Sequence, residues 1–364
     1  MRIMFHLGHP AHFHLFKNSI KSLNNNGHSV KILIKKKDIL ESLLINEGLE
    51  YENILPEGRK ANKFHIALGL LKQDLGVLKF AKKFKPDLLI GTSVPISHVG
   101  KLLNIPSIDV NEDDANAVPL HSKLAYPLIG HILSPSSCNN GKWESKSIKY
   151  NGYHELAYLH PKVFQADINI CKKYLDTKRD FFVLRFSGLD AHHDRGISGI
   201  NDEKAMQLIK ILKPHGNVFI TSERPLSTDL EPYRKKINPL DIHHILAFAK
   251  IYIGDSQTMA AESGVLGTPF IRYNDFVGKI GYLKELEEVY KLGFGFRTNE
   301  YDEMLNKLNE LLLKKNIEGL FIERRKIMLK DKIELSSFLT WLIENYPKSV
   351  SDWKCNFELQ DNFI

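Results

Sequence analysis

Short apolar runs alternate with amphipathic segments along the first half of the chain. The runs RIMFHL, HSVKILIK, LEYENILP, PDLLIG, PSIDV and HILSPS are typical of buried strands. Between the first two, Phe13, Phe16, Ile20 and Leu23 recur at helical spacing, and Gly27 follows as a C-terminal cap. Further helices are predicted over DILESLLINEG, residues 62–84, PISHVGKLLN and NAVPLHSKLAYPLI. Because strands that alternate with helices pair in parallel through right-handed crossovers, this half predicts a doubly wound sheet.

The same alternation begins again in the second half. Strands are predicted over RDFFVLRF, GNVFITS, KIYIG and TPFIRYN, and helices over INICKKYL, DEKAMQLIKIL, DIHHILAFA and QTMAAESGVL. Regular alternation stops between Tyr150 and Pro161, and a helical tail follows from about Tyr301 to Tyr346. We therefore expect an α/β protein with two Rossmann-like, doubly wound parallel-sheet domains, at residues 1–155 and 162–331. A C-terminal helix at about 332–364 could pack back on the first domain.

Small polar and charged residues gather directly after the predicted strands. In open parallel sheets, ligands bind beyond the carboxyl ends of the strands, so these loops are the places to look for a site. The loops are GHPAHFH, GTSVP, NEDDAN, SGLDAHHDRG, TSERP and GDSQT.

The segment GDSQTMAAESGVLGTP predicts an anion site at the start of a helix. Ser256 is a good N-cap, which would expose the backbone N–H groups of Gln257, Thr258 and Met259 at the positive end of the helix dipole. Such a site suits a diphosphate. Glu262 shares a face with Thr258, so its carboxylate is carried toward the helix start and can accept hydrogen bonds from a ribose. The alternative is a capped helix whose Glu262 pairs with a neighbouring arginine.

Composition narrows the classes of function without selecting one. The chain of 364 residues is 43% hydrophobic and 26% charged, which is ordinary for a globular protein, and it has no apolar run suited to a membrane span. The start MRIMFHLGHP is typical of a strand rather than of a signal peptide, and three distant cysteines define neither disulfides nor a zinc site. These features favour a cytoplasmic protein.

The formal net charge of +7 is spread along the chain. Its basic segments lack the interleaved aromatic residues of a nucleic-acid surface, so we expect no nucleic-acid partner. The segment FHIALGLLKQDLGVLKFAKKFKPD is apolar along Ile66, Leu70, Leu71, Leu78 and Phe84 and carries many lysines. A crossover helix that covers the sheet is the favoured interpretation, and peripheral contact with the inner membrane is the alternative.

Three segments together resemble one family. GHPAHFHLF, YNGYHELAYLHP and FFVLRFSGLDAHHDRG are similar to a domain-of-unknown-function family of GT-B-like bacterial and archaeal proteins. GDSQTMAAESGVLGTP resembles the nucleotide-sugar segment of GT-B glycosyltransferases and non-hydrolysing UDP-GlcNAc 2-epimerases. The resemblance spans Met1 to about Phe296. It implies the GT-B fold, with two Rossmann-like domains facing across a cleft and the donor held mainly by the C-terminal domain.

The resemblance also implies roles for single residues. In GT-B relatives, the helix that matches Gln257–Leu266 holds the diphosphate at its start and the ribose at the residue that matches Glu262. A histidine of the N-terminal domain lies close to the acceptor. His12 is our first candidate for the general base that deprotonates the acceptor, and His9 is the second.

Other loops add candidates of lower weight. Glu112 and Asp113 could deprotonate an acceptor, although capping of the next helix is the alternative for Asp113. GT-B catalysis normally needs no bound metal, so we expect no metal site and no cofactor beyond the donor itself. Further candidates for phosphate and sugar contacts are Arg185, Ser187, Arg224, Asn274 and Lys279.

These features favour a metal-independent GT-B glycosyltransferase. It would move a sugar from a UDP-sugar to a hydroxyl of a glycan or lipid-linked acceptor in surface polysaccharide or lipopolysaccharide synthesis, and domain closure would complete the site. The first alternative is a non-hydrolysing UDP-HexNAc 2-epimerase that uses Glu112 and Asp113 with His192 or His193. The second is a nucleotide- or glycan-binding protein on an inactive GT-B scaffold, because the first loop keeps only Gly8 as a glycine.

Overall fold

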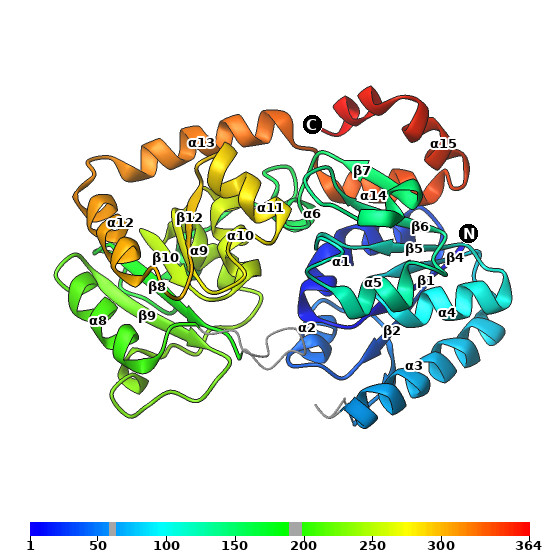
Figure 1. The fold of residues 1–364 in the computed structure, drawn as a ribbon, viewed down its shortest axis with the longest axis horizontal. Coiled ribbons are helices and arrows are strands. Elements are labelled where there is room, and N and C mark those ends of the chain that lie inside the picture. Colours follow the sequence, from blue (N-terminus) through cyan, green and yellow to red (C-terminus); the bar gives the residue numbers. More distant parts are fainter. Residues whose placement is uncertain (58–62, 189–198) are drawn as a thin grey trace. The chain divides into compact units, whose positions relative to one another are not determined.

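The computed structural model describes residues 1–57, 63–188 and 199–364, and the chain forms two compact units. Unit 1 comprises Met1–Tyr158 and Lys332–Ile364, and unit 2 comprises Leu159–Asp331. Each unit is built on a parallel sheet with helices on its faces (Figure 1). The predicted class of two doubly wound α/β domains is therefore confirmed.

Unit 1 contains a seven-stranded sheet with the order β3-β2-β1-β4-β5-β6-β7. Its strands are β1 (Arg2–Leu7), β2 (Ser29–Lys35), β3 (Glu52–Leu55), β4 (Leu88–Gly91), β5 (Ser107–Val110), β6 (His131–Pro135) and β7 (Ser147–Tyr150). Its helices are α1 (Pro10–Asn25), α2 (Leu40–Asn46), α3 (Lys63–Phe84), α4 (Val94–Leu103), α5 (Pro119–Ala125), α14 (Leu335–Glu344) and α15 (Lys348–Cys355), with the short α6 (Leu156–Leu159) at the chain boundary between the units. Helices α3, α4 and α5 lie along one face of the sheet, and α1, α2 and α14 along the other (Figure 1).

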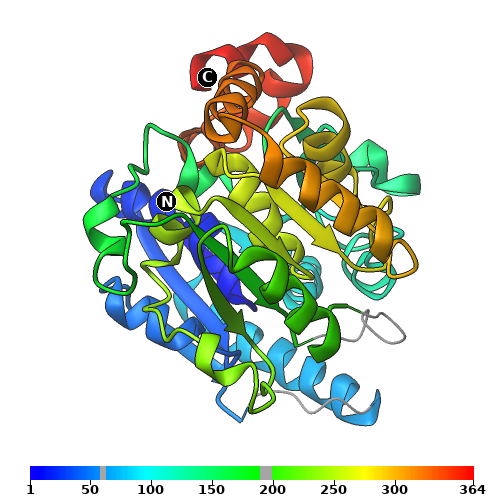
Figure 2. The same cartoon turned by 90° about the vertical axis from the view of Figure 1, so that its left-hand side faces the viewer.

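Unit 2 contains a five-stranded sheet with the order β12-β11-β10-β8-β9. Its strands are β8 (Phe181–Phe186), β9 (Asn217–Ser222), β10 (Ile251–Gly254), β11 (Phe270–Tyr273) and β12 (Gly293–Phe296). Its helices are α7 (Ile168–Cys171), α8 (Asp202–Leu212), α9 (Ile242–Phe248), α10 (Gln257–Leu266), α11 (Gly281–Lys284), α12 (Tyr301–Leu313) and α13 (Ile317–Asp331), and a π-helical turn spans Glu285–Val289. Figure 2 is turned so that this unit faces the viewer, and its strands run side by side in one direction.

The two sheets are buried on both faces, as parallel sheets require. Every residue of β4, β5, β10 and β11 is buried. At the end of β4, a Cβ atom on Gly91 would lie 2.4 Å from the carbonyl oxygen of His6. Only glycine therefore lets β1 and β4 lie together at this point, and this contact positions the loops that follow both strands.

Two strands and one helix differ from the sequence prediction. The edge strands β7 and β12 were not predicted, because SIKY is short and half polar while GFGF is rich in glycine, which weakens a strand signal. The helix predicted over INICKKYL has a single turn, Ile168–Cys171, and the chain then continues as turns.

The outer side of α3 also differs from its predicted pattern. Leu71 was expected on the apolar face that packs on the sheet, yet it is 54% exposed. Val77 and Ala81 pack inward instead, and Leu78 and Phe84 lie beside that core. No helix of the described ranges is long and apolar enough to cross a membrane.

The C-terminal segment is part of the core of unit 1. It is hydrogen-bonded to β7 and the following loop, since the backbone Ile333 N donates to Asn151 O at 2.8 Å and the indole Nε1 of Trp353 donates to Lys149 O at 2.6 Å. Phe338 of α14 is fully buried, and its ring centroid lies 4.3 Å from that of Trp353. Residues 332–364 thus contribute both hydrogen bonds and apolar packing to this unit.

We expect Phe338→Ala to lower the free energy of unfolding of unit 1 by about 3–5 kcal/mol, because it leaves a cavity in an aromatic cluster. Urea unfolding followed by tryptophan fluorescence measures the change. Leu102→Ala is the control, since Leu102 is 68% exposed and its loss should change stability by less than about 0.5 kcal/mol. Equal effects of the two substitutions would show that the C-terminal segment does not stabilise unit 1.

Candidate functional site

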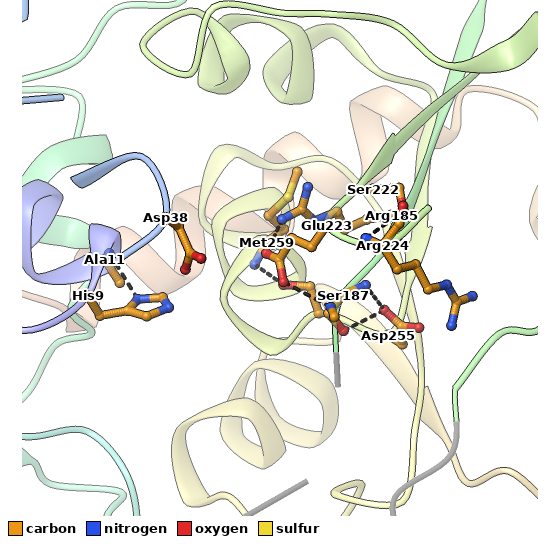
Figure 3. A network of polar contacts seen from close by, with 12 residues as sticks. His9, Ala11, Asp38, Arg185, Ser187, Ser222, Glu223, Arg224, Asp255 and Met259 are labelled. Carbon is orange, nitrogen blue, oxygen red and sulfur yellow. Dashed lines mark hydrogen bonds and ion pairs between the residues drawn. The ribbon is translucent and has the colours of Figure 1, made fainter. Parts of the chain in front are cut away.

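The strands β8 and β10 mark the topological switch point of unit 2, because the chain continues from β8 to β9 on one side and returns to β10 on the other. Ligands of open α/β sheets bind beyond the carboxyl ends of the strands at such a point. Here Ser187 N and Oγ donate to Asp255 Oδ1 at 2.6 and 2.8 Å, bridging the two strand ends (Figure 3). Burial raises the pKa of Asp255, and the hydrogen bonds from Ser187 oppose that rise.

The loop after β11 is tied to the same point. Asn274 is fully buried, its Nδ2 donates to Asp255 O at 2.8 Å, and its Oδ1 accepts from Phe276 N at 2.9 Å. Both ends of this amide therefore hold the loop in place. Lys279 lies farther along the loop, where it is exposed and its Nζ is 6.0 Å from the ring centroid of Phe276.

Helix α10 begins at Gln257, as its sequence predicts. Ser256 is the N-cap, and its Oγ accepts from Met259 N at 3.4 Å. The Met259 amide is therefore engaged by the cap, whereas the amides of Gln257 and Thr258 have no acceptor among the described residues. The helix ends at Gly267, whose φ of +88° favours glycine.

Glu262 lies on the buried side of α10 and is 4% exposed. A buried carboxylate needs a compensating hydrogen-bond donor. The donor is His243 of α9, whose Nε2 lies 2.9 Å from Glu262 Oε1. His243 is thus a hydrogen-bond partner of Glu262, and this contact fixes the orientation of the carboxylate.

Two arginines lie beside the strand ends of unit 2 (Figure 3). Arg185, at the end of β8, forms an ion pair with Glu223 through Nη2, and its buried Nε has no partner in the part of the chain that the structure describes. Arg224 donates to the carbonyl of Ile200, and its guanidinium lies 5.2 Å from the ring centroid of Phe186. Glu223 thus pairs with Arg185, while Arg224 is held by the main chain and by a ring.

A second polar network lies at the carboxyl edge of unit 1, where β1 and β4 form the switch point. His6 of β1 is hydrogen-bonded through Nδ1 to Ser93 Oγ, directly after β4. Ser93 N donates to Asp109 Oδ1 of β5 at 3.0 Å, and His121 Nε2 of α5 lies 2.8 Å from Asp109 Oδ2. Four residues from three elements and the loop after β4 therefore meet in one chain of hydrogen bonds, in which Ser93 takes part through both its hydroxyl and its backbone N–H.

The surroundings of His6 and His121 shift their pKa values in opposite directions. Burial, followed by the charge of Lys35, lowers the pKa of His6 to about 3. Burial also acts to lower the pKa of His121, but the charge of Asp109 and its hydrogen bond outweigh burial, so the pKa of His121 is raised. At neutral pH, His6 is therefore uncharged, whereas His121 binds a proton more readily than an ordinary histidine.

The candidates of the first loop lie at the start of α1. His9 is the N-cap, and its Nδ1 accepts from Ala11 N at 3.2 Å (Figure 3). Gly8 N donates to His12 Nδ1 at 3.1 Å. Burial first, and then the neighbouring charges of His9 and Lys35, hold the pKa of His12 well below its usual value. Both histidines therefore organise the turn that follows β1.

The acidic loop after β5 contributes two different contacts. Glu112 Oε2 accepts from His154 N at 3.2 Å and lies 3.4 Å from His154 Nδ1. Asp113 N donates to Asn111 Oδ1 at 3.1 Å, and the Asp113 charge contributes to the raised pKa of the neighbouring His121. The N-cap of α5 is Val118, so neither carboxylate caps that helix.

The histidines proposed for the epimerase alternative, His192 and His193, lie outside the described residues, as does Asp194. Within residues 1–57, 63–188 and 199–364, no group of three or more His, Cys, Asp or Glu side chains is placed to hold a metal ion.

Sequence reasoning missed Asp109, His121 and His243. Asp109 carried a signal, because a carboxylate within the short buried strand PSIDV must have a partner. His121 and His243 carried none, since each meets its carboxylate through packing between different elements rather than through a sequence spacing.

The structure is similar to solved nucleotide-sugar enzymes. One is UDP-GlcNAc 2-epimerase from Neisseria meningitidis bound to UDP-GlcNAc, with 13% identity, a TM-score of 0.66, and coverage of 95% of this chain and 100% of that chain. Another is the spinosyn rhamnosyltransferase SpnG complexed with thymidine diphosphate, with 14% identity, a TM-score of 0.64, and coverage of 95% and 100%. A third is UDP-GlcNAc 2-epimerase from Methanocaldococcus jannaschii, with 14% identity, a TM-score of 0.62, and coverage of 90% and 98%.

Likeness at this level of identity shows the fold, so the chain has the GT-B-like fold of these proteins. No curated protein matches the sequence. A sequence model of the family described as "Protein of unknown function (DUF354)" matches residues 1–335.

We expect the stability of unit 1 to fall as the pH drops below 6.5, because His6 takes up a proton in the unfolded chain but not, until about pH 3, in the folded one. Its stabilising contribution is complete above pH 6.5 and falls by about 1.4 kcal/mol per pH unit below it. Urea unfolding at pH 7 and pH 5 measures this dependence, which His6→Asn should make shallower. The exposed His215 provides a control, His215→Asn. If stability depended on pH equally in His6→Asn and in the wild type, the low pKa of His6 would not be the cause of the dependence.

Proposed function

We propose a nucleotide-sugar glycosyltransferase activity for this chain, which belongs to the DUF354 family of proteins of unknown function. The donor, for which we favour a UDP-sugar, binds to unit 2, and unit 1 provides the acceptor side. The observation that carries the proposal is the start of α10, where two amides without acceptors and a buried, oriented carboxylate occur on one helix.

The diphosphate binds at the amides of Gln257 and Thr258. These N–H groups lie at the positive end of a ten-residue helix, and such an end stabilises a bound phosphate. Arg185 lies at the neighbouring strand end, and its Nε is available for a phosphate oxygen. Stabilisation of the leaving diphosphate by these groups needs no metal ion.

The ribose hydroxyls bind to Glu262, which His243 holds in place. Ser187, Arg224 and Asn274 fix the surrounding loops through their contacts with neighbouring backbone and side chains. Lys279 is exposed on the loop after β11 and contacts the donor sugar or a phosphate.

The similar solved structures support nucleotide binding by this chain, and they include enzymes of two reaction types. They include an epimerase bound to UDP-GlcNAc and a rhamnosyltransferase complexed with thymidine diphosphate. In the reaction proposed here, a glycan or lipid-linked acceptor loses its hydroxyl proton to a base of unit 1. Surface polysaccharide or lipopolysaccharide synthesis in the cytoplasm is the setting that we propose.

We expect Glu262→Gln to weaken the binding of UDP about tenfold or more, because a charge-assisted hydrogen bond to the ribose contributes about 1.5–3 kcal/mol. Titration calorimetry measures the affinity. Wild-type protein should also bind 2′-deoxy-UDP less tightly than UDP, and the variant should lose most of this preference. The control is Glu318→Gln, the same change at a carboxylate that is 62% exposed on α13.

Two results would contradict this assignment. The first is the absence of UDP, ADP, GDP and thymidine diphosphate binding by the wild-type protein. The second is an equal loss of affinity for UDP and 2′-deoxy-UDP in Glu262→Gln, which would place the effect of Glu262 on the fold rather than on the ribose.

The second candidate function is a 2-epimerase, because several similar structures are UDP-GlcNAc 2-epimerases. The acidic loop with Glu112 and Asp113 would supply its acid and base. Incubation with UDP-GlcNAc alone separates the two activities: an epimerase converts the substrate to its C2 epimer without an acceptor, whereas a transferase releases UDP slowly by hydrolysis. Nucleotide binding with neither outcome would indicate a binding protein on this fold.

We also propose that α3 contacts an anionic membrane surface. On its outer side, Leu68, Leu71 and Leu75 are 40%, 54% and 57% exposed, and the exposed Lys79 and Lys82 continue the same stripe. Leucines buried among headgroups and lysines beside acidic lipids both favour binding. This contact would bring a lipid-linked acceptor to unit 1.

Accordingly, the protein should sediment with phosphatidylglycerol vesicles at low ionic strength and not with phosphatidylcholine vesicles. Replacing Leu71 and Leu75 with serine should reduce the bound fraction about tenfold or more, because each lost leucine removes about 1.5–3 kcal/mol of apolar burial. Leu313→Ser, at a residue that is 80% exposed on unit 2, is the control. Equal binding by all variants would exclude this face of α3.

A further inference from the structure

We infer that His121, oriented by Asp109, is the general base that removes the proton from the acceptor hydroxyl, in place of His12. This inference rests on the proposed transferase function and deepens it, because it names the group that accepts the proton.

The position of the pair in the fold supports this role. The hydrogen-bond chain from His6 through Ser93 to Asp109 starts at the switch point between β1 and β4 and ends at His121. Ligands bind beyond the carboxyl ends of strands at such a point. Asp109 is fully buried, whereas the side chain of His121 is 19% exposed. Within the pair, solvent therefore reaches the imidazole of His121 but not the carboxylate of Asp109.

The hydrogen bond to Asp109 fixes the tautomer of His121. A carboxylate only accepts, so Nε2 of His121 carries a proton and donates it to Asp109 Oδ2 at 2.8 Å. In the neutral imidazole, the lone pair is then on Nδ1. This atom has no hydrogen-bond partner among residues 1–57, 63–188 and 199–364, so it is available to accept a proton.

In His12 and His9, the roles of the two ring nitrogens are the reverse of those in His121. Each uses Nδ1 to accept a backbone N–H, from Gly8 and from Ala11 respectively, so the neutral ring carries its proton on Nε2. A ring in this tautomer presents a donor to a substrate rather than a lone pair. The low pKa of His12 agrees with a ring that stays neutral and accepts protons poorly.

The charges around His121 raise its pKa and so make the ring a stronger base. Asp109 of β5 and Asp113 of the following loop favour its protonated form, and Lys35 of β2 opposes it. Directly after α5, the Tyr126 ring lies edge-on with its centroid 5.7 Å from that of His121, and its hydroxyl accepts from the side-chain amide of Asn111 in the loop after β5. The neighbouring α4 carries two ionisable groups, the exposed Lys101 and the partly buried His98, which is paired with Asp74 of α3.

The chemical step conserves atoms and charge. The oxygen of the acceptor forms a bond to the anomeric carbon of the donor, and the bond from that carbon to the diphosphate oxygen breaks. The electron pair leaves with the nucleoside diphosphate, and the acceptor proton moves to Nδ1 of His121. Asp109 stabilises the imidazolium that results and remains ionised.

The test compares UDP release and UDP binding in variants of the full chain, with UDP-GlcNAc and a panel of other UDP-sugars as probes and water as the acceptor. His121→Asn should lower the rate of UDP release about 100-fold or more while UDP affinity, measured by calorimetry, stays unchanged. Asp109→Asn should shift the acid limb of the pH–rate profile to lower pH, because it removes the charge that raises the pKa of His121. His98→Asn is the matched control, since His98 Nδ1 also pairs with a carboxylate, Asp74, at 3.0 Å.

Nitrogen NMR of histidine-labelled protein adds a readout that needs no substrate, and it should show the Nε2-protonated tautomer for His121. Wild-type rates of UDP release in His121→Asn, or an Nδ1-protonated His121, would overturn the assignment while leaving the proposed function intact. A rate loss in His98→Asn equal to that in His121→Asn would also overturn it. If wild-type protein binds no UDP and releases none from any UDP-sugar, the proposed function fails, and the base assignment fails with it.

Discussion

A buried carboxylate beside the switch point organises each unit. In unit 1, Asp109 of β5 joins Ser93 to His121, and in unit 2, Asp255 joins the end of β10 to Ser187 after β8. Burying a charge is unfavourable unless donors surround it, so each carboxylate requires its neighbouring loops to stay in place. The loops that carry the candidate chemistry are therefore held by the same interaction that satisfies the carboxylate.

The two units use this anchoring for different kinds of chemistry. The carboxylate of unit 2 stands beside the N-terminus of α10, an arginine and a histidine-bound glutamate, which together suit an anionic ligand that carries hydroxyl groups. The carboxylate of unit 1 stands within a group of histidines whose pKa values are shifted in opposite directions, and such differences separate acid and base roles. In the proposed function, donor binding and proton transfer belong to separate sheets, each with its own anchor.

Much of the fold could be predicted from the sequence, because apolar runs and helical spacings are local signals. The start of α10 was predicted correctly, since Ser256 and Gly267 are cap residues that act within a few positions. The edge strands β7 and β12 were missed because they are specified by hydrogen bonding to the neighbouring strands β6 and β11 rather than by their own composition. Likewise, His121 and His243 become functional candidates only through contacts between elements that are distant in the sequence.

A crystal structure of the protein with UDP tests the central claim most directly. The account predicts the diphosphate at the amides of Gln257 and Thr258, and a ribose hydroxyl within hydrogen-bonding distance of Glu262 while His243 keeps its contact. UDP bound elsewhere on unit 2, or a start of α10 that the protein's own side chains fill in the complex, would contradict it.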